Sequence, residues 1–71
     1  MAKVFTHPIS GCVYTLNEVG LVRIDDPSTG EYGVFDDKGI WYDGPLRDVD
    51  FQILGWVGRT PEARALREAN A

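Results

Sequence analysis

His7-Pro8-Ile9-Ser10-Gly11 and, nineteen positions later, Asp26-Pro27-Ser28-Thr29-Gly30 are the stretches that decide the fold of this 71-residue chain. Each joins a proline, which presets φ for a turn, to a hydroxyl side chain and a closing glycine that can adopt positive φ. The repeat continues, because residues 16–21 align with residues 35–40 at the same offset. Glycines at positions 11, 20, 30 and 39 thus close short polar stretches, which predicts an antiparallel β-meander built on a 19-residue hairpin repeat.

The segments between these turns are rich in β-branched and aromatic residues, which favour strands. They predict five strands, at residues 3–7, 12–16, 21–25, 31–35 and 40–43. Residues 51–54 predict a sixth strand that can run to Val57. Alternatively, a degenerate third copy of the repeat would place a turn at residues 55–58. The expected fold is therefore mainly β: an antiparallel meander of five to six short strands, as a partly curled sheet or a small open barrel.

The end of the chain has the signals of one short α-helix. Thr60 suits the N-cap, Pro61 suits the first helical position, and Glu62 places a negative charge in the first turn. About ten residues are too few for a helix that persists alone in water. We therefore expect a single domain, with the meander in residues 1–59 and a docked helix in residues 60–71.

The distribution of charge along the chain favours some classes of binding partner over others. The chain has a net charge of −4, and residues 17–50 hold nine acidic residues against three basic ones. Acidic turns repel phosphate, which disfavours nucleic acid as a partner. A single cysteine, Cys12, excludes an internal disulfide, and residues 1–4 show no signal sequence. No apolar run is long enough to span a bilayer, and we expect a cytoplasmic protein without membrane contact.

Large apolar side chains occur on both faces of the predicted sheet. Registers estimated from the turns gather one face from Phe5, Tyr14, Leu16, Leu21, Tyr32, Val34 and Trp41. They gather the other from Val4, Val13, Val22, Ile24, Phe35, Ile40 and Tyr42. A glycine bulge can shift a pair by one residue, so these sets are approximate. Both faces are nevertheless apolar, and exposed contiguous apolar surface marks an interface.

The expected interface lies near the C-terminal third of the chain. If Phe51, Ile53 and Val57 face the core, then Leu54 and Trp56 face away from it, close to an arginine. Tryptophan beside arginine is typical of binding hot spots, although either tryptophan can equally fill a small core. The predicted interface residues are Trp56, Leu54, Arg59, Trp41 and Leu66.

Two clusters have residue types suited to chemistry. The estimated register aligns His7, Cys12 and Asp25 across three strands, which suggests a weak metal site or a cysteine nucleophile. This spacing has no specificity of its own, and a structural cysteine beside a turn histidine explains it equally well. Two turn tips at one end of the sheet could together hold Ca²⁺ weakly or stay hydrated; they contain Asn17, Glu18, Asp36 and Asp37.

These observations lead to a functional expectation. The sequence predicts a small protein-interaction module or accessory subunit, which buries an apolar sheet face and the Trp56 segment against a protein partner or a second copy. We expect it to be non-catalytic on its own and to need no cofactor. One alternative is an acidic inhibitor or nucleic-acid mimic from a phage or mobile element. The other is the site at His7, Cys12 and Asp25.

Overall fold

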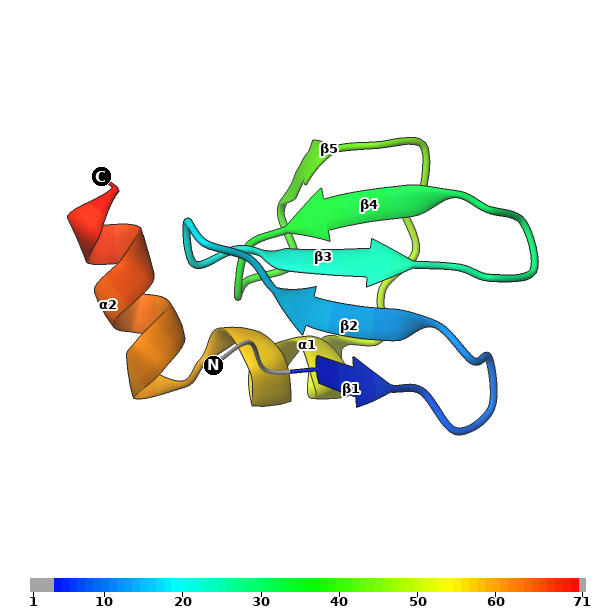
Figure 1. Cartoon of the computed structure of the whole chain (residues 1–71), viewed down its shortest axis with the longest axis horizontal. Helices are drawn as coiled ribbons and strands as arrows, with labels where there is room; N and C mark the ends of the chain where they lie inside the picture. The colour runs from blue at the N-terminus through cyan, green and yellow to red at the C-terminus, as the bar shows by residue number, and fades with distance from the viewer. Residues whose placement is uncertain (1–3, 71) are drawn as a thin grey trace.

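The computed structural model describes residues 4–70 and contains one antiparallel sheet followed by two short helices (Figure 1). Its strands are β1 (Val4–Thr6), β2 (Val13–Leu16), β3 (Val22–Asp25), β4 (Tyr32–Phe35) and β5 (Trp41–Asp43). They are hydrogen-bonded in chain order, β1-β2-β3-β4-β5. The helices are α1 (Phe51–Gly58) and α2 (Pro61–Ala69). The predicted fold class is confirmed: the protein is mainly β, with an open five-stranded meander and helical structure at its C-terminus.

The turns that open on His7 and Asp26 share one set of hydrogen bonds. In each, the backbone N–H of the first residue donates to the carbonyl five positions on, over 2.8 and 2.9 Å. The N–H two positions on donates to the first residue's side chain, at His7 Nδ1 over 3.1 Å and at Asp26 Oδ1 over 2.9 Å. The closing glycines have φ of 75° and 76°. The His7 imidazole and the Asp26 carboxylate thus accept equivalent backbone hydrogen bonds in equivalent turns.

The turns that open on Asn17 and Asp36 form a second equivalent pair. Each side-chain oxygen accepts from the N–H groups two and four positions on, over 3.1 and 2.8 Å for Asn17 and over 2.8 and 2.9 Å for Asp36. Each closing glycine, Gly20 or Gly39, donates to the carbonyl of the first residue over 3.2 Å. The same local chemistry therefore recurs nineteen residues apart at both kinds of turn.

One face of the sheet builds the core together with the helices. Leu16 lies opposite Val22, and Tyr14 lies opposite Ile24. The register estimated from the turns is therefore wrong by one residue between β2 and β3, because the loop takes up one residue more, and the two predicted faces are mixed accordingly. The buried apolar side chains are Tyr14, Leu16, Val22, Ile24, Phe35, Ile53, Leu54, Val57 and Ala63.

Residues 51–58 form helix α1, so the predicted sixth strand and the alternative turn are both wrong. Asp50 begins the helix, because its Oδ1 accepts from the N–H groups of Gln52 and Ile53 over 3.0 and 3.4 Å. Ile53, Leu54 and Val57 follow at helical spacing and lie in the core. Leu54 has 0% of its surface exposed, so the expectation that it faces away from the core is also wrong.

The connection from β5 to α1 crosses the same face of the sheet. It passes behind the strands in Figure 1, and a Cβ on Gly33 would meet the carbonyl oxygen of Leu46. The Leu46 N–H donates to the Tyr32 carbonyl over 2.9 Å. A glycine in β4 therefore gives the backbone room to cross, and the connection and α1 lie on the same side of the sheet.

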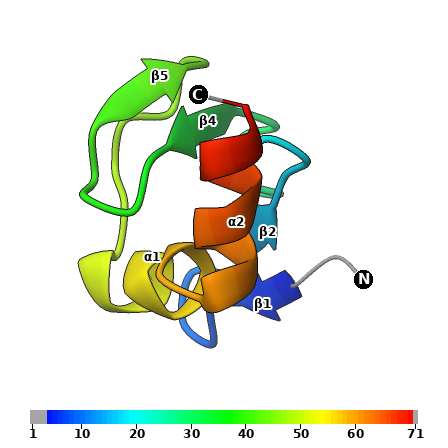
Figure 2. The ribbon, with the colours of Figure 1, turned by 90° about the vertical axis from the view of Figure 1, so that its left-hand side faces the viewer.

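Helix α2 begins as predicted and docks through an arginine. Thr60 Oγ1 accepts from the Ala63 N–H over 3.1 Å, with Pro61 in the first helical turn. Arg67 Nη1 donates to the carbonyls of Gly20 and Gly58 over 2.8 and 2.7 Å. Figure 2 shows α2 standing across the end of the sheet. Within residues 4–70, neither helix has the length and apolar character needed to cross a membrane.

Candidate functional site

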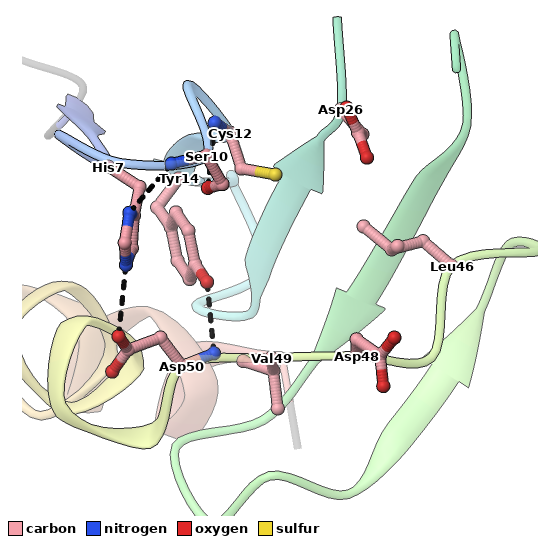
Figure 3. Close-up of a pocket in the computed structure, with 9 residues that line it drawn as sticks. All are labelled: His7, Ser10, Cys12, Tyr14, Asp26, Leu46, Asp48, Val49 and Asp50. Carbon is pink, nitrogen blue, oxygen red and sulfur yellow. Dashed lines mark hydrogen bonds and ion pairs between the residues drawn. The ribbon is translucent and has the colours of Figure 1, made fainter. Parts of the chain in front are cut away.

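A cavity of about 340 Å³ lies between the first turn, the connection and the start of α1 (Figure 3). It contains two of the three residues predicted for a metal or cysteine site. Its lining comprises His7, Ser10, Cys12, Tyr14, Asp26, Leu46, Asp48, Val49 and Asp50. Three carboxylates, a thiol and a phenol therefore face one cavity, and the hydrogen bonds of these groups decide what they can do.

His7 makes hydrogen bonds with both ring nitrogens. Its Nδ1 accepts from the N–H groups of Ile9 and Ser10 over 3.1 and 3.2 Å. A nitrogen that accepts carries no proton, so these contacts assign the proton to Nε2. Nε2 lies 3.1 Å from Asp50 Oδ2, and 16% of the His7 side chain is exposed. Both nitrogens are thus occupied in holding the first turn to the start of α1.

Asp50 joins this turn to the core as well. Its N–H donates to the Tyr14 hydroxyl over 3.0 Å. Burial raises the pKa of Tyr14, so the phenol stays protonated and neutral. The hydrogen bond from His7, followed by those from the helix backbone, lowers the pKa of Asp50 below its usual 3.8. The three side chains form a structural junction in which each polar group already has a protein partner.

The predicted row of His7, Cys12 and Asp25 does not exist. Asp25 lies opposite Val13 rather than Cys12, and its carboxylate is 3.1 Å from Arg23 Nη2. That carboxylate raises the pKa of Arg23 through a hydrogen bond. In Figure 3 the Cys12 sulfur and the His7 imidazole point in different directions. The one-residue slip between β2 and β3 removes the alignment.

Metal ligation has no geometric support in the described part of the chain. Among residues 4–70, no three side chains of His, Cys, Asp or Glu gather in a way that could hold a metal ion. In the turns considered for Ca²⁺, Asn17 and Asp36 accept backbone hydrogen bonds. Asp37 lies 3.6 Å from Arg67 Nη2. These side-chain oxygens stabilise turns and helix docking.

The predicted interface residues are spread over three elements. Trp56 has 51% of its surface exposed on α1, and its ring meets that of Phe5 edge-on at a centroid distance of 5.4 Å. Arg59 is exposed at the end of α1, where its Nε donates to the Asp37 carbonyl over 3.2 Å. Leu66 is half-buried against the core. Leu54 lies inside the core and cannot contact a partner in this fold.

Sequence reasoning missed the most exposed apolar cluster of α1 and β5. Phe51 and Ile40 have 64% and 57% of their surfaces exposed. The Phe51 ring occupies the space beside Gly39, the residue that precedes Ile40 in the chain. The one available signal was the position of Phe51 directly after an aspartate that can cap a helix.

Trp41 in β5 and Arg47 in the connection to α1 form a second exposed pair on this side of the molecule. Trp41 Nε1 donates to the Gly44 carbonyl over 2.8 Å, which fixes the indole. The Arg47 guanidinium carbon lies 3.8 Å from the centroid of that ring, a close cation–π contact. Figure 2 shows β5, the connection and the start of α1 on one side of the molecule. We call Ile40, Trp41, Arg47 and Phe51 the Phe51 patch.

Comparison of the chain with protein-family models, with curated proteins and with solved structures found no match in any of the three.

Proposed function

We propose that this protein is a small interaction module, or accessory subunit, that binds another protein through the Phe51 patch and the exposed ring of Trp56 on the same helix. One observation carries the proposal: Phe51, Ile40 and Trp56 each expose more than half of their surface. Isolated exposed apolar residues are ordinary, but clustered ones lined by a tryptophan and an arginine have the composition of binding hot spots.

Burial of the exposed apolar side chains would favour binding. Burying one large apolar side chain contributes about 1.5–3 kcal/mol. The Phe51 ring lies beside Gly39, and Ile40 is the next residue, so we expect one partner surface to cover both. Trp41 and Arg47 are already held in one orientation, which reduces the side-chain entropy lost on binding.

The alternative of an acidic mimic receives less support from the same contacts. Among the turn carboxylates, Asp26 and Asp36 accept backbone hydrogen bonds. Asp25 and Asp37 lie against arginines. Neutralised or hydrogen-bonded carboxylates imitate the phosphates of a nucleic acid poorly. A cytoplasmic location belongs to the proposal, and the free thiol of Cys12 supports it.

The test is affinity capture from the native host with three tagged forms of the chain. These are the wild type, a double variant with Ile40→Ser and Phe51→Ser, and a control, Ile9→Ser. Ile9 is 91% exposed in the first turn, so the control removes apolar surface outside the patch. We expect the wild type and the control to retain the same companion, and the double variant to lose it while its circular dichroism is unchanged.

Two results would reject the proposal. One is a companion retained equally by the double variant, which would place binding elsewhere. The other is a wild-type chain that light scattering shows as a lone monomer, that captures nothing specific, and that binds little of a dye sensitive to exposed apolar surface. A second copy as the companion would appear in the same scattering measurement as a doubled mass.

A further inference from the structure

Arg47 is the arginine of the Phe51 patch, and its donors are free. Arg23 is paired with Asp25, Arg59 donates to a carbonyl, and Arg67 donates to two. The Arg47 guanidinium instead lies flat on Trp41 and makes no hydrogen bond or ion pair with residues 4–70. A guanidinium has five N–H donors in a planar fork, so this one is oriented and ready to bind an anion.

Other charged side chains lie around the patch. Lys38 is exposed in the turn beside Gly39, and Arg59 is exposed where α1 ends against that turn. The nearby carboxylates differ: Asp37 lies near Arg67, Asp43 accepts from the Gly44 N–H over 2.9 Å, and Asp48, next to Arg47, is exposed. Charges of both signs therefore surround the patch, and what distinguishes Arg47 is its oriented, unpaired fork.

From this geometry we propose that the Phe51 patch recognises an acidic, apolar segment of a partner protein, with a carboxylate on the Arg47 fork and apolar side chains against Phe51 and Ile40. This inference rests on the proposed function and names the partner's chemistry. Carboxylate fits the fork of Arg47 in a bidentate manner. The adjoining exposed aromatic and aliphatic surface calls for apolar neighbours to that carboxylate.

Polyanions are the less suitable occupants of this patch. Nucleic-acid binding depends on many phosphate contacts made by a broadly basic surface. Here the cations are few, the whole chain has a net charge of −4, and the patch also contains the exposed apolar residues Phe51 and Ile40. A second copy could supply carboxylates, but each copy also brings its own negative charge to the contact. A protein segment with one or two acidic residues among apolar ones supplies a carboxylate for Arg47 and apolar contacts for Phe51 and Ile40.

The experiment selects binding peptides from a phage library of random short peptides, with the folded wild-type chain as bait. Enriched peptides are then synthesised and their affinities measured for the wild type and for Arg47→Gln, Arg47→Lys and Arg64→Gln. Arg64 is an exposed arginine on α2 and serves as the matched control. We expect peptides with an acid flanked by apolar residues, bound about tenfold more weakly by Arg47→Gln and unchanged by Arg64→Gln.

A cycle of variants then identifies the contact. Replacing the peptide's acid by its amide should weaken binding to the wild type about tenfold and should have little effect on binding to Arg47→Gln. Arg47→Lys should fall between, because lysine keeps the charge and loses the planar fork. Circular dichroism of each variant confirms that the fold is unchanged, which we expect because these side chains are exposed.

The outcomes separate this inference from the proposed function. Peptides that depend on Phe51 but contain no acid, or that ignore Arg47→Gln, would overturn the inference and leave the interaction module standing. A Phe51-dependent dimer with no peptide enrichment would do the same. Arg47-dependent binding of a single-stranded oligothymidylate in place of peptides would overturn both. Both would also be overturned if the chain is a monomer, enriches no peptides, and captures host proteins equally well with and without Phe51.

Discussion

Gly20 and Gly30 close two successive turns with φ of 85° and 76°, yet their surroundings differ completely. Gly20 is buried under α2, where an added Cβ would lie 2.6 Å from the Ala63 carbonyl oxygen and 2.7 Å from the Arg67 nitrogen. Gly30 has no atom within 4 Å of the same position. Both turns thus end on a glycine with positive φ, and tertiary contacts decide which of them the fold depends on.

The largest expected effect is that of Gly20→Ala. The new Cβ meets backbone atoms of α2, which cannot move without undocking the helix, and the residue keeps an unfavourable positive φ. We expect a loss of about 3–5 kcal/mol in the free energy of unfolding, the sum of overpacking and left-handed strain. Urea denaturation followed by circular dichroism measures it. A loss equal to that of Gly30→Ala would mean that α2 does not press on this turn.

Arg67→Met is expected to have the second largest effect. Methionine keeps the aliphatic length but leaves the carbonyls of Gly20 and Gly58 without their charged donor. We expect a loss of about 2–4 kcal/mol, since each hydrogen bond to a charged group contributes about 1.5–3 kcal/mol. Arg64→Met, on the exposed side of the same helix, should change stability by about 0.5 kcal/mol or less. Similar losses in the two variants would argue against docking through Arg67.

His7→Ala tests how far the first turn differs from its counterpart at Asp26. The change removes three hydrogen bonds: two at Nδ1 and the one to Asp50. We expect a loss of about 2–3 kcal/mol at about 1 kcal/mol for each. His7→Asn should recover the turn but not the link to α1, because Asn17 caps its own turn in that way. Full recovery by asparagine would show that the link to Asp50 contributes nothing.

Much of this fold was predictable because its signals are local. Turns closed by glycine, strands between them and the N-cap at Thr60 each depend on a few neighbouring residues, and each was found at its predicted place. Helix α1 was missed because Ile53, Val57 and two glycines favour other structures locally. Packing of Ile53, Leu54 and Val57 on the sheet overrides that preference.

The candidate site was less predictable, because it depends on contacts distant in sequence. Trp41 and Trp56 are interface candidates because of their residue type, and the structure shows that both are exposed. Phe51 was assigned to the core because a strand would alternate its side chains, whereas a helix places it on the flank beside Gly39. The link from His7 to Asp50 spans 43 positions, and no local pattern indicates it.

Gly30→Ala is expected to destabilise the protein much less than Gly20→Ala. No neighbour obstructs the added methyl group, so the change leaves only the strain of a positive φ. We expect a loss of about 1–1.5 kcal/mol in the free energy of unfolding. The same urea titration measures it, and the difference between the two variants isolates the packing of α2. A loss above that of Arg67→Met would contradict the open surroundings of this turn.

Acid titration gives the smallest expected effect and compares the tethered turn with the open one. Hydrogen bonds lower the pKa of Asp50, chiefly the one from His7, and that of Asp26, chiefly the one from the Ser28 hydroxyl. Both values fall below the usual 3.8, so each carboxylate stabilises the fold fully above that pH and progressively less as pH falls through its lowered pKa. Both groups lie at the surface, so each contribution is small.

Urea midpoints measured from neutral pH down to about pH 2.5 should fall less steeply in Asp50→Asn and in Asp26→Asn than in the wild type. His7→Asn should reduce the pH dependence that arises from Asp50 and leave the contribution of Asp26 intact. A double variant with His7→Asn and Asp26→Asn should lose both contributions. An unchanged pH dependence in His7→Asn would mean that the imidazole does not hold the Asp50 carboxylate in its charged form.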